Sequence, residues 1–257
     1  MVITFFRRLI IIVLFLFLPG CATLYNPATG RNEVILINSQ TEEAIGKNVS
    51  AEITKEHAVL ADRRFTDRIQ SIGARLSEVS DRKDLTYRFF VLADKELNAV
   101  SLPGGYIYVN KGLMDALDDD ELAFVVGHEI GHVAARHAVK KIQANMAYQM
   151  LLSLAFAGLG SNAGSAQDIA QSVNTAYNLI QLGYSREDEY LSDKLGVKYA
   201  FKAGFNPRSA LSSLAKLKTN EGASVKVLGY LRTHPYVDDR IKALTVYIPE
   251  LTGIKNN

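Results

Sequence analysis

The chain has 257 residues, of which 48 % are hydrophobic and 22 % are charged, a composition that fits one or two folded domains and excludes a mainly disordered protein. Its formal net charge is +2, and without Arg7 and Arg8 it has 27 basic and 27 acidic residues. This balance gives no electrostatic reason to expect a nucleic-acid partner. The single cysteine, Cys21, excludes an internal disulfide and a multi-cysteine metal site.

The first 20 residues have the organisation of a secretory signal peptide. The basic pair Arg7-Arg8 precedes ten apolar residues from Leu9 to Leu18, a run too short to span a bilayer. The following Pro19-Gly20-Cys21 resembles a bacterial lipobox, in which a small residue before the cysteine allows cleavage and the cysteine then carries lipid. We therefore predict a signal peptide at 1–20 and lipidation of Cys21. An uncleaved anchor and an ordinary signal with an incidental cysteine are the alternatives.

The rest of the chain divides into a short segment and one domain. Residues 21–38 are expected to lie next to the lipid anchor, and residues 39–257 to form the domain. Ala22 is not aspartate, which in Gram-negative bacteria resembles the pattern for sorting to the outer membrane. We therefore expect a lipoprotein of the bacterial cell envelope, attached through Cys21 to the outer membrane and facing the periplasm.

Two helices are predicted at the start of the domain. Ser39 and Glu42 have the spacing of a capping box ahead of apolar residues that recur at helical spacing from Ile45 to Ile53. A second apolar stripe, at intervals of four and three residues, runs from Phe65 to Val79.

A small β-sheet is predicted next. Alternating apolar residues from Leu85 to Val91 indicate a strand, and the segment from Ala99 to Val109 indicates a hairpin that turns at Pro103-Gly104-Gly105. From Asp118 onward the pattern is almost entirely helical, with acidic residues first, where the helix dipole favours them. The fold class is therefore expected to be α+β and mainly α.

The first of these later helices contains an H-E-x-x-H motif at residues 128–132. His128 and His132 are four residues apart and share a helix face, so both can bind one Zn²⁺, while Glu129 projects beside them as a base. A pair of core histidines is the alternative. Two buried imidazoles and a carboxylate would then need polar partners and would supply no packing that leucine could not. We predict one zinc ion per chain.

A zinc peptidase needs a third protein ligand, and His137 is the first candidate. It follows His128 by nine residues, which places it on the opposite side of a continuous helix. It also lacks the spacing of the third histidine in metzincins. His137 is therefore expected on the surface or in a layer behind the ligands.

A carboxylate from a later helix is the other candidate, and a helix capped by Ser185 supplies three of them. Glu187, Asp188 and Glu189 lie in its first turn. Of the three, Glu189 alone has an acidic residue, Asp193, four positions later and so on the same face. Asp193 can accept a hydrogen bond from a ligating histidine. We therefore predict Glu189 as the ligand, and a solvated acidic face for the other two.

The region between the motif and this helix is apolar around Met146 and small and polar from Gly158 to Ser165. Its apolar part is about half as long as a bilayer span requires. A buried helix followed by a loop is one interpretation, and a hairpin that gates the cleft or touches a membrane is the other. Beyond it, Asn206-Pro207 ahead of Ser209 to Leu217 indicates further packing helices.

Together these motifs resemble the HtpX and CAAX prenyl endopeptidase family of zinc metallopeptidases, and in particular its periplasmic lipoprotein branch of BepA-like and LoiP-like proteases. The resemblance covers nearly all of the predicted mature chain. It depends on the segments 98–109, 112–113, 128–132, 185–193, 233–235 and 239–241. It implies a zincin-like (gluzincin) fold for residues 39–257. It also implies zinc ligation by His128, His132 and Glu189, with Glu129 as the base and Asp193 supporting the first histidine.

The resemblance implies three further roles. His234 and Arg240 are candidates to stabilise the oxyanion, although His234 could instead occupy the fourth zinc position at rest. A turn residue before Pro235 and a helix-surface charge, respectively, are the alternatives for these two residues. The hairpin that begins at Asn98 and Ala99 supplies an edge strand, which in zincins pairs with an extended peptide substrate.

Two functions follow as expectations. The first is a zinc endopeptidase that cleaves misfolded or misassembled envelope proteins, and the second is a lipid-anchored chaperone or scaffold for outer-membrane protein assembly that retains a metal site. The intact Glu129 favours the enzyme, because a scaffold needs no carboxylate beside a bound water. Polypeptide substrates and the outer-membrane assembly machinery are the expected partners. The chain lacks the membrane helices of HtpX and the tetratricopeptide repeats of BepA-like proteins, so targeting inferred from those repeats is not expected here.

Overall fold

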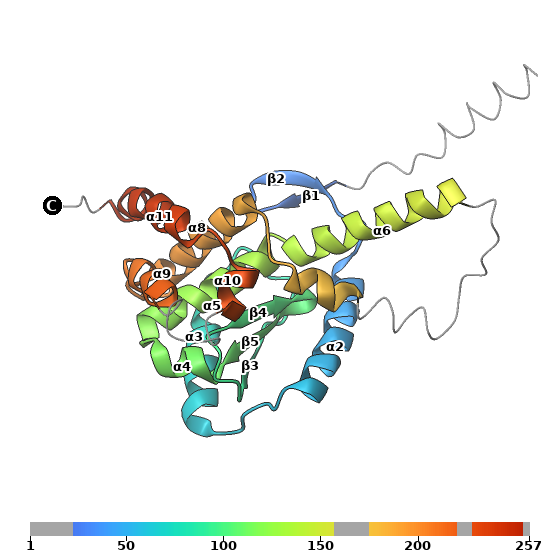
Figure 1. The fold of residues 1–257 in the computed structure, drawn as a ribbon. Helices are drawn as coiled ribbons and strands as arrows, with labels where there is room; N and C mark the ends of the chain where they lie inside the picture. The colour runs from blue at the N-terminus through green and yellow to red at the C-terminus, as the bar shows by residue number, and fades with distance from the viewer. Residues whose placement is uncertain (1–22, 157–174, 220–227, 254–257) are drawn as a thin grey trace, which may run out of the picture.

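Helices pack around a small three-stranded sheet in this computed structural model, which describes residues 23–156, 175–219 and 228–253 (Figure 1). The predicted signal peptide and Cys21 lie outside these residues. Within them, no helix is long and apolar enough to cross a membrane. The elements in chain order are β1 (Thr23–Asn26), β2 (Arg31–Val34), α2 (Ser39–Glu56), α3 (Arg63–Val79), β3 (Arg88–Leu92), β4 (Ala99–Leu102), the 3₁₀ turn η1 (Pro103–Gly105), β5 (Tyr106–Asn110), α4 (Lys111–Ala116), α5 (Asp119–Ala134), α6 (His137–Phe156), α8 (Arg186–Lys202), α9 (Ser209–Thr219), α10 (Leu228–Thr233) and α11 (Val237–Thr252).

The sheet has the order β3-β5-β4, in which β3 is parallel and β4 antiparallel to β5. The predicted hairpin is confirmed, with Leu102 opposite Tyr106 at the turn. The turn needs glycine because Gly104 has a φ of 76° and a Cβ atom there would lie 2.7 Å from the Cα atom of Glu43. β4 lies at the edge of the sheet.

Each face of the sheet is covered by its own hydrophobic core. Alternate residues of β5 divide between them: Ile107 and Val109 join the main core with α3, α5 and α8, whereas Tyr106 and Tyr108 join a smaller core with α2 and α6. The helix α3 confirms the predicted stripe, and β3 begins at Arg88, three residues after the predicted start. The mainly α, α+β class is confirmed.

The motif helix α5 is buried along nearly its whole length and is packed closely against α8. It begins with a capping box formed by Asp118 and Glu121. Glycines bring the two helices together, because a Cβ atom on Gly127 would lie 2.9 Å from the carbonyl oxygen of Gly196. One on Gly131 would lie 3.0 Å from that of Ser192. This approach places the first turn of α8 beside the histidines of α5.

The predicted capping box at the start of α2 is wrong. Asn38 caps this helix instead, and its side chain accepts a hydrogen bond from the amide of Thr41. Ser39 donates to Asp84. Glu42 is buried and is paired with two arginines described below, so its carboxylate is not available to cap the helix.

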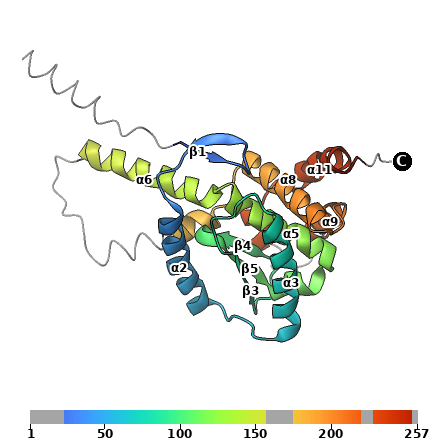
Figure 2. The same cartoon turned by 180° about the vertical axis from the view of Figure 1, so that it is seen from behind.

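The helix α6 extends away from the body in both views (Figures 1 and 2). The side chains of Met146 and Tyr148 are 59 % and 58 % exposed, so the buried-helix interpretation is wrong at this position. The base of α6 holds the β1–β2 hairpin, which the sequence analysis did not predict, through a 2.6 Å ion pair between Lys140 Nζ and Glu33 Oε1. The predicted loop at 158–165 lies outside the described residues.

Candidate metal centre

Two histidines of α5 direct their Nε2 atoms toward a common point. His128 and His132 are buried, and their Nε2 atoms lie 2.9 Å apart. Their other ring nitrogens are held from behind: His128 Nδ1 lies 2.9 Å from Asp193 Oδ1, and His132 Nδ1 lies 2.8 Å from His137 Nδ1. Burial lowers the pKa of His132 to about 3, so this imidazole is in the neutral form that binds metals.

Glu189 reaches the same point from the first turn of α8. The helix starts with a capping box formed by Ser185 and Asp188, which confirms Ser185 as the cap. Glu189 is buried, with Oε1 at 3.3 Å from His132 Nε2 and Oε2 at 3.5 Å from His128 Nε2. Burial by itself would raise the pKa of this carboxyl, but nearby positive groups, among them Arg240, lower it well below its ordinary value.

His234 completes the cluster from the segment between α10 and α11. It is 1 % exposed, so the interpretation as an ordinary turn residue before Pro235 does not describe it. Its Nδ1 atom lies 3.1 Å from Glu189 Oε1 and 3.2 Å from His128 Nε2. Burial would lower its pKa, but Glu189 and Glu129 raise it above the ordinary value. The carboxylates of Glu189 and Glu129 therefore stabilise a positive charge within the cluster.

The cluster has the donor set of a metal site. Ligand atoms of His128, His132, Glu189 and His234 all lie within 4.8 Å of one another, and all four residues are buried. Imidazole nitrogens that face one another cannot all be satisfied by hydrogen bonds, because a neutral ring carries one N–H. Glu189 Oε2 is buried without a hydrogen-bond partner among the described residues. Arg240 Nη1 lies 2.9 Å away, but not in hydrogen-bonding geometry. A cation bound here would satisfy these atoms.

Asp193 and Arg240 form a buried ion pair behind the ligands. Arg240 Nη2 donates to Asp193 Oδ1 at 2.6 Å, and Arg240 Nε donates to Asp193 Oδ2 at 2.8 Å. Arg240 is fully buried, so it is not a helix-surface charge. Its Nη1 atom faces Glu189 and donates to the carbonyl oxygen of His234 at 3.2 Å. These contacts favour a role in positioning the ligands over the predicted contact with an oxyanion.

Glu129 lies beside the cluster, as the motif predicts, and is held by a residue that sequence reasoning missed. Its Oε2 atom accepts a 2.7 Å hydrogen bond from Ser101 Oγ on β4. Its Oε1 atom lies 3.2 Å from His234 Nε2, without hydrogen-bonding geometry, and is otherwise buried and unpaired. The alternation of β4 could have indicated Ser101, because it shares a face with Ala99 and is a polar residue at a buried position.

Ala99 is the first residue of the edge strand β4, and Asn98 directly precedes it. Ala99 is buried, and Asn98 borders a cavity of about 410 Å³ together with Val100 and Arg232. Asn98 Oδ1 is buried without a hydrogen-bond partner among the described residues. Their contact with a substrate stays a prediction.

His137 lies in the layer behind the ligands, and the ring of Tyr184 packs against both His132 and His137. The predicted position of His137 assumes a continuous helix, but α5 ends at Ala134, and Arg136 has a φ of 58°. This break turns His137 back toward His132. The ring of Tyr184 stacks on His132 with centroids 4.0 Å apart and planes 25° apart. Burial raises the pKa of Tyr184 well above its ordinary value, so its hydroxyl is a neutral donor.

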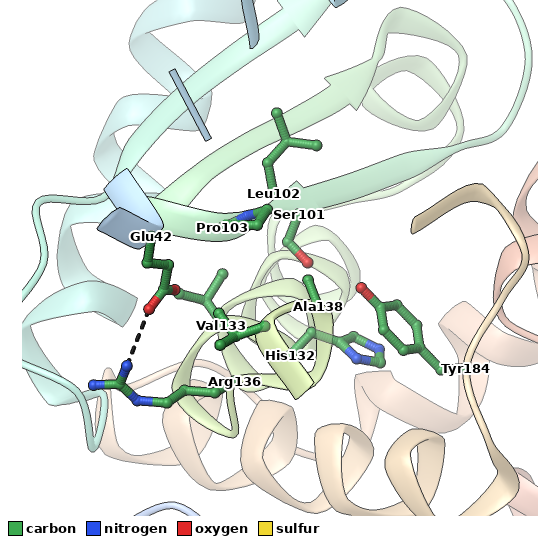
Figure 3. Close-up of a pocket in the computed structure, with 10 residues that line it drawn as sticks. Glu42, Ser101, Leu102, Pro103, His132, Val133, Arg136, Ala138 and Tyr184 are labelled. Carbon is green, nitrogen blue, oxygen red and sulfur yellow. Dashed lines mark hydrogen bonds and ion pairs between the residues drawn. The ribbon is translucent and has the colours of Figure 1, made fainter. Parts of the chain in front are cut away.

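A second, mostly buried polar cluster lies at the end of α5, and Figure 3 shows two of its residues, Glu42 and Arg136. We call Glu42, Arg82, Asp84 and Arg136 the Glu42 cluster. Arg82 Nη2 donates to Glu42 Oε2 at 2.6 Å, and Arg136 Nη1 donates to the same oxygen at 3.1 Å. Glu42 Oε1 accepts from the amide of Gly104 at 3.2 Å. The cluster therefore joins α2, α5 and the turn after β4.

The fold and the site together define a zincin-like metallopeptidase, because a glutamate from the later helix α8 joins the histidine pair of an H-E-x-x-H helix beside an edge strand. The sequence profile described as peptidase family M48 matches residues 63–248. The chain belongs to this family, which confirms the resemblance found in the sequence.

Curated relatives share this family resemblance. Mitochondrial metalloendopeptidase OMA1 of Schizosaccharomyces pombe is 27 % identical over 233 residues, which cover 88 % of this chain and 66 % of the relative. A putative beta-barrel assembly-enhancing protease of Vibrio cholerae is 30 % identical over 188 residues, or 71 % and 39 % of the two chains. Metalloprotease LoiP of Escherichia coli is 29 % identical over 163 residues, or 63 % of each chain. The matches thus span less than two thirds of these relatives.

Proposed function

We propose that this chain is a zinc-dependent endopeptidase that hydrolyses peptide bonds in misfolded or misassembled proteins of the cell envelope. The observation that carries the proposal is the position of Glu129. Its carboxylate lies beside the cluster of His128, His132, Glu189 and His234, with one oxygen fixed by Ser101 and the other unpaired. A base in this position is what hydrolysis requires and what a purely structural metal site does not.

His128, His132 and Glu189 would hold the zinc ion. When bound, zinc supplies Lewis acidity that polarises a peptide carbonyl and lowers the pKa of water toward about 7. Asp193 fixes the orientation of His128 through Nδ1, and Arg240 in turn fixes Asp193. The ligands are thus held from behind by buried partners.

Glu129 moves the proton in the proposed reaction. Its Oε1 atom takes a proton from the attacking water and then delivers it to the nitrogen of the leaving amine. Ser101 holds Oε2 and so keeps Oε1 toward the cluster. Because Ser101 belongs to β4, the strand that orients the base is also the strand proposed to bind the substrate.

The edge of β4 would bind the substrate in extended form. Main-chain hydrogen bonds to residues such as Asn98 and Ala99 hold a peptide with little dependence on its sequence, which suits loosely folded proteins of many kinds. His234 would either donate to the developing oxyanion or occupy the fourth ligand position at rest. Its contacts with Glu189 and His128 support the second role in the present conformation.

We also propose that the enzyme is an outer-membrane lipoprotein anchored through Cys21 and facing the periplasm. The relative from Vibrio cholerae is named for beta-barrel assembly, which supports an outer-membrane assembly context. Changing Cys21 to Ser behind an ordinary cleavable signal should release the protein from membranes. The native chain should carry diacylglycerol by intact mass. A mature mass without lipid, or with residues 1–20 retained, would contradict the anchor and leave the peptidase proposal untouched.

The central experiment compares wild type with Glu129→Gln, using the chain from Ala22 onward. Gln is nearly isosteric but cannot accept the proton, so casein cleavage should fall by at least about 100-fold. Zinc content and melting temperature should stay unchanged. Glu187→Gln, on the exposed start of α8, is the matched control and should cleave like wild type. Unchanged cleavage by Glu129→Gln would contradict the proposed base.

A silent wild type would be resolved by His234→Ala. Activity gained in this variant would show that His234 blocks the centre at rest. If both proteins cleave nothing while binding zinc, the peptidase proposal fails, and the chaperone or scaffold function predicted as the alternative takes its place.

A further inference from the structure

We propose that Tyr184 is a catalytic residue of this centre, whose hydroxyl donates a hydrogen bond to the oxygen of the scissile carbonyl as that oxygen gains negative charge. The inference rests on the peptidase function proposed above. It assigns a role to a residue that the H-E-x-x-H motif does not contain and that the sequence analysis did not select.

The hydroxyl of Tyr184 is buried and has no hydrogen-bond partner among the described residues. Buried donors are nearly always paired, so one without a partner requires an explanation. Three other donors at the centre are already engaged: Arg240 holds Asp193, Ser101 donates to Glu129, and His234 contacts Glu189. The tyrosine hydroxyl is therefore available for a ligand.

The hydroxyl of Tyr184 also points into a small cavity beside the centre. Tyr184, His132 and Ser101 line a small cavity, and in Figure 3 the hydroxyls of Tyr184 and Ser101 face each other across it. Its volume is about 10 Å³, close to what one water molecule needs. Two residues that line the cavity link it to the centre: Ser101 donates to the base Glu129, and His132 is one of the proposed ligands.

The backbone around Tyr184 is fixed before any substrate arrives. Gly183 has a φ of 73°, and a Cβ atom there would lie 2.9 Å from the carbonyl oxygen of Arg232, so the segment passes close to the one that carries His234. Lys141 Nζ donates to the carbonyl oxygens of Leu179 and Gly183 and lies 4.8 Å from the centroid of the Tyr184 ring. A donor fixed in this way needs no reorganisation during the reaction, as transition-state stabilisation requires.

A second buried tyrosine makes the assignment specific. Tyr230 also has an unpaired hydroxyl, and its ring packs against His234 with centroids 4.5 Å apart. Tyr230 does not line the small cavity that Tyr184, His132 and Ser101 share. The geometry therefore favours Tyr184 as the donor.

The test is Tyr184→Phe, which keeps the ring on His132 and removes only the hydroxyl. With a fluorogenic peptide, kcat should fall by about 100-fold, the lower end of the effect of removing one oxyanion donor, while KM, zinc content and melting temperature stay as in wild type. Affinity for a phosphinic peptide, which carries oxyanion-like oxygens, should fall in parallel. Affinity for a reduced-amide peptide, which has no oxygen at that position, should not change. Tyr87→Phe, which deletes a buried unpaired hydroxyl outside the centre, is the control and should match wild type in every measurement.

Three outcomes would overturn the assignment. The first is a Tyr184→Phe variant with wild-type kcat and phosphinic affinity, and the second is the expected loss appearing in Tyr230→Phe instead. The third is loss of zinc from Tyr184→Phe, which would make Tyr184 a support for His132. These outcomes are distinct from failure of the proposed function, in which wild type itself neither cleaves the peptide nor binds the phosphinic probe. In that case the role of Tyr184 is overturned with it.

Discussion

The two buried polar clusters of this protein differ in how their charges are neutralised. In the Glu42 cluster, Arg82 and Arg136 are paired with Glu42 and Asp84 in hydrogen-bonding geometry. In the metal centre, imidazole nitrogens face one another, and two carboxylate oxygens lack hydrogen-bond partners among the described residues. Because unpaired polar groups are costly to bury, the first cluster is complete within the chain, whereas the second would be completed by a bound cation.

The balance of charge supports this distinction. With neutral imidazoles, the carboxylates of Glu129, Glu189 and Asp193 exceed the single charge of Arg240 by two, which a divalent cation would neutralise. The raised pKa of His234 has the same origin, since Glu189 and Glu129 outweigh the effect of its burial. Substitutions in the metal centre should therefore weaken metal binding. Substitutions in the Glu42 cluster should lower the free energy of unfolding whether or not metal is bound.

The largest effect is expected from Glu189→Ala, which removes a ligand from the metal centre. Zinc affinity should fall by more than about 100-fold, because loss of an outer partner of a ligand already costs about 10–100-fold. Zinc should raise the melting temperature of wild type and not that of the variant. Glu187→Ala removes an exposed carboxylate two residues earlier and is the matched control. Equal loss of zinc from both variants, measured by elemental analysis and calorimetry, would contradict the choice of Glu189.

The next effect is expected from Glu42→Gln, which breaks the other cluster. Arg82 and Arg136 are 5 % and 6 % exposed, and without the charge of Glu42 only the carboxylate of Asp84 remains to balance the two buried guanidinium groups. The free energy of unfolding should fall by about 3 kcal/mol or more, while zinc stoichiometry stays at the wild-type value.

The adjacent Glu43→Gln is the control for Glu42→Gln. Glu43 pairs with Arg88 and its side chain is 47 % exposed, so this change should cost about 0–1 kcal/mol. Urea unfolding curves of both variants, recorded with and without chelator, measure the difference. A loss of zinc in Glu42→Gln without loss of stability would contradict the separation of the two clusters.

The smallest effect concerns Asp84 and acid. Burial would raise its pKa, but hydrogen bonds from Arg82 and Ser39 and the charge of Arg136 lower it to about 2 from an ordinary 3.8. Stability from this group is therefore present above about pH 4 and is lost as the pH falls toward 2. The side chain of Asp84 is 45 % exposed, so solvent screening should keep the contribution below about 1 kcal/mol.

Asp84→Asn should flatten the dependence of unfolding free energy on pH between about pH 4 and pH 2. Unfolding should be measured in the presence of chelator, so that metal release does not contribute. Asp67→Asn, at an exposed position of α3, should keep the wild-type slope. If Asp84→Asn also keeps it, the ion pair with Arg82 does not stabilise the protein in this range.

The features that the sequence predicted correctly depend on residues that are close together in the chain. The apolar stripe of α3, the turn between β4 and β5 and the cap at Ser185 follow from spacing and residue type within a few positions. Selecting Glu189 through its neighbour on the same face, Asp193, used the same kind of local geometry. His137 does lie behind the ligands as predicted, but the assumption that α5 continues to it was wrong, because the helix ends at Ala134.

By itself, the sequence determined the family and the residues of its H-E-x-x-H motif, because such a helix needs only the helical period to place two imidazoles and a carboxylate together. Only the tertiary structure decided the rest of the centre. It buried Arg240 behind Asp193, brought Ser101 to Glu129 and left the hydroxyl of Tyr184 unpaired beside His132. These contacts join residues of different elements, and periodicity describes the face of one element without specifying what packs against it.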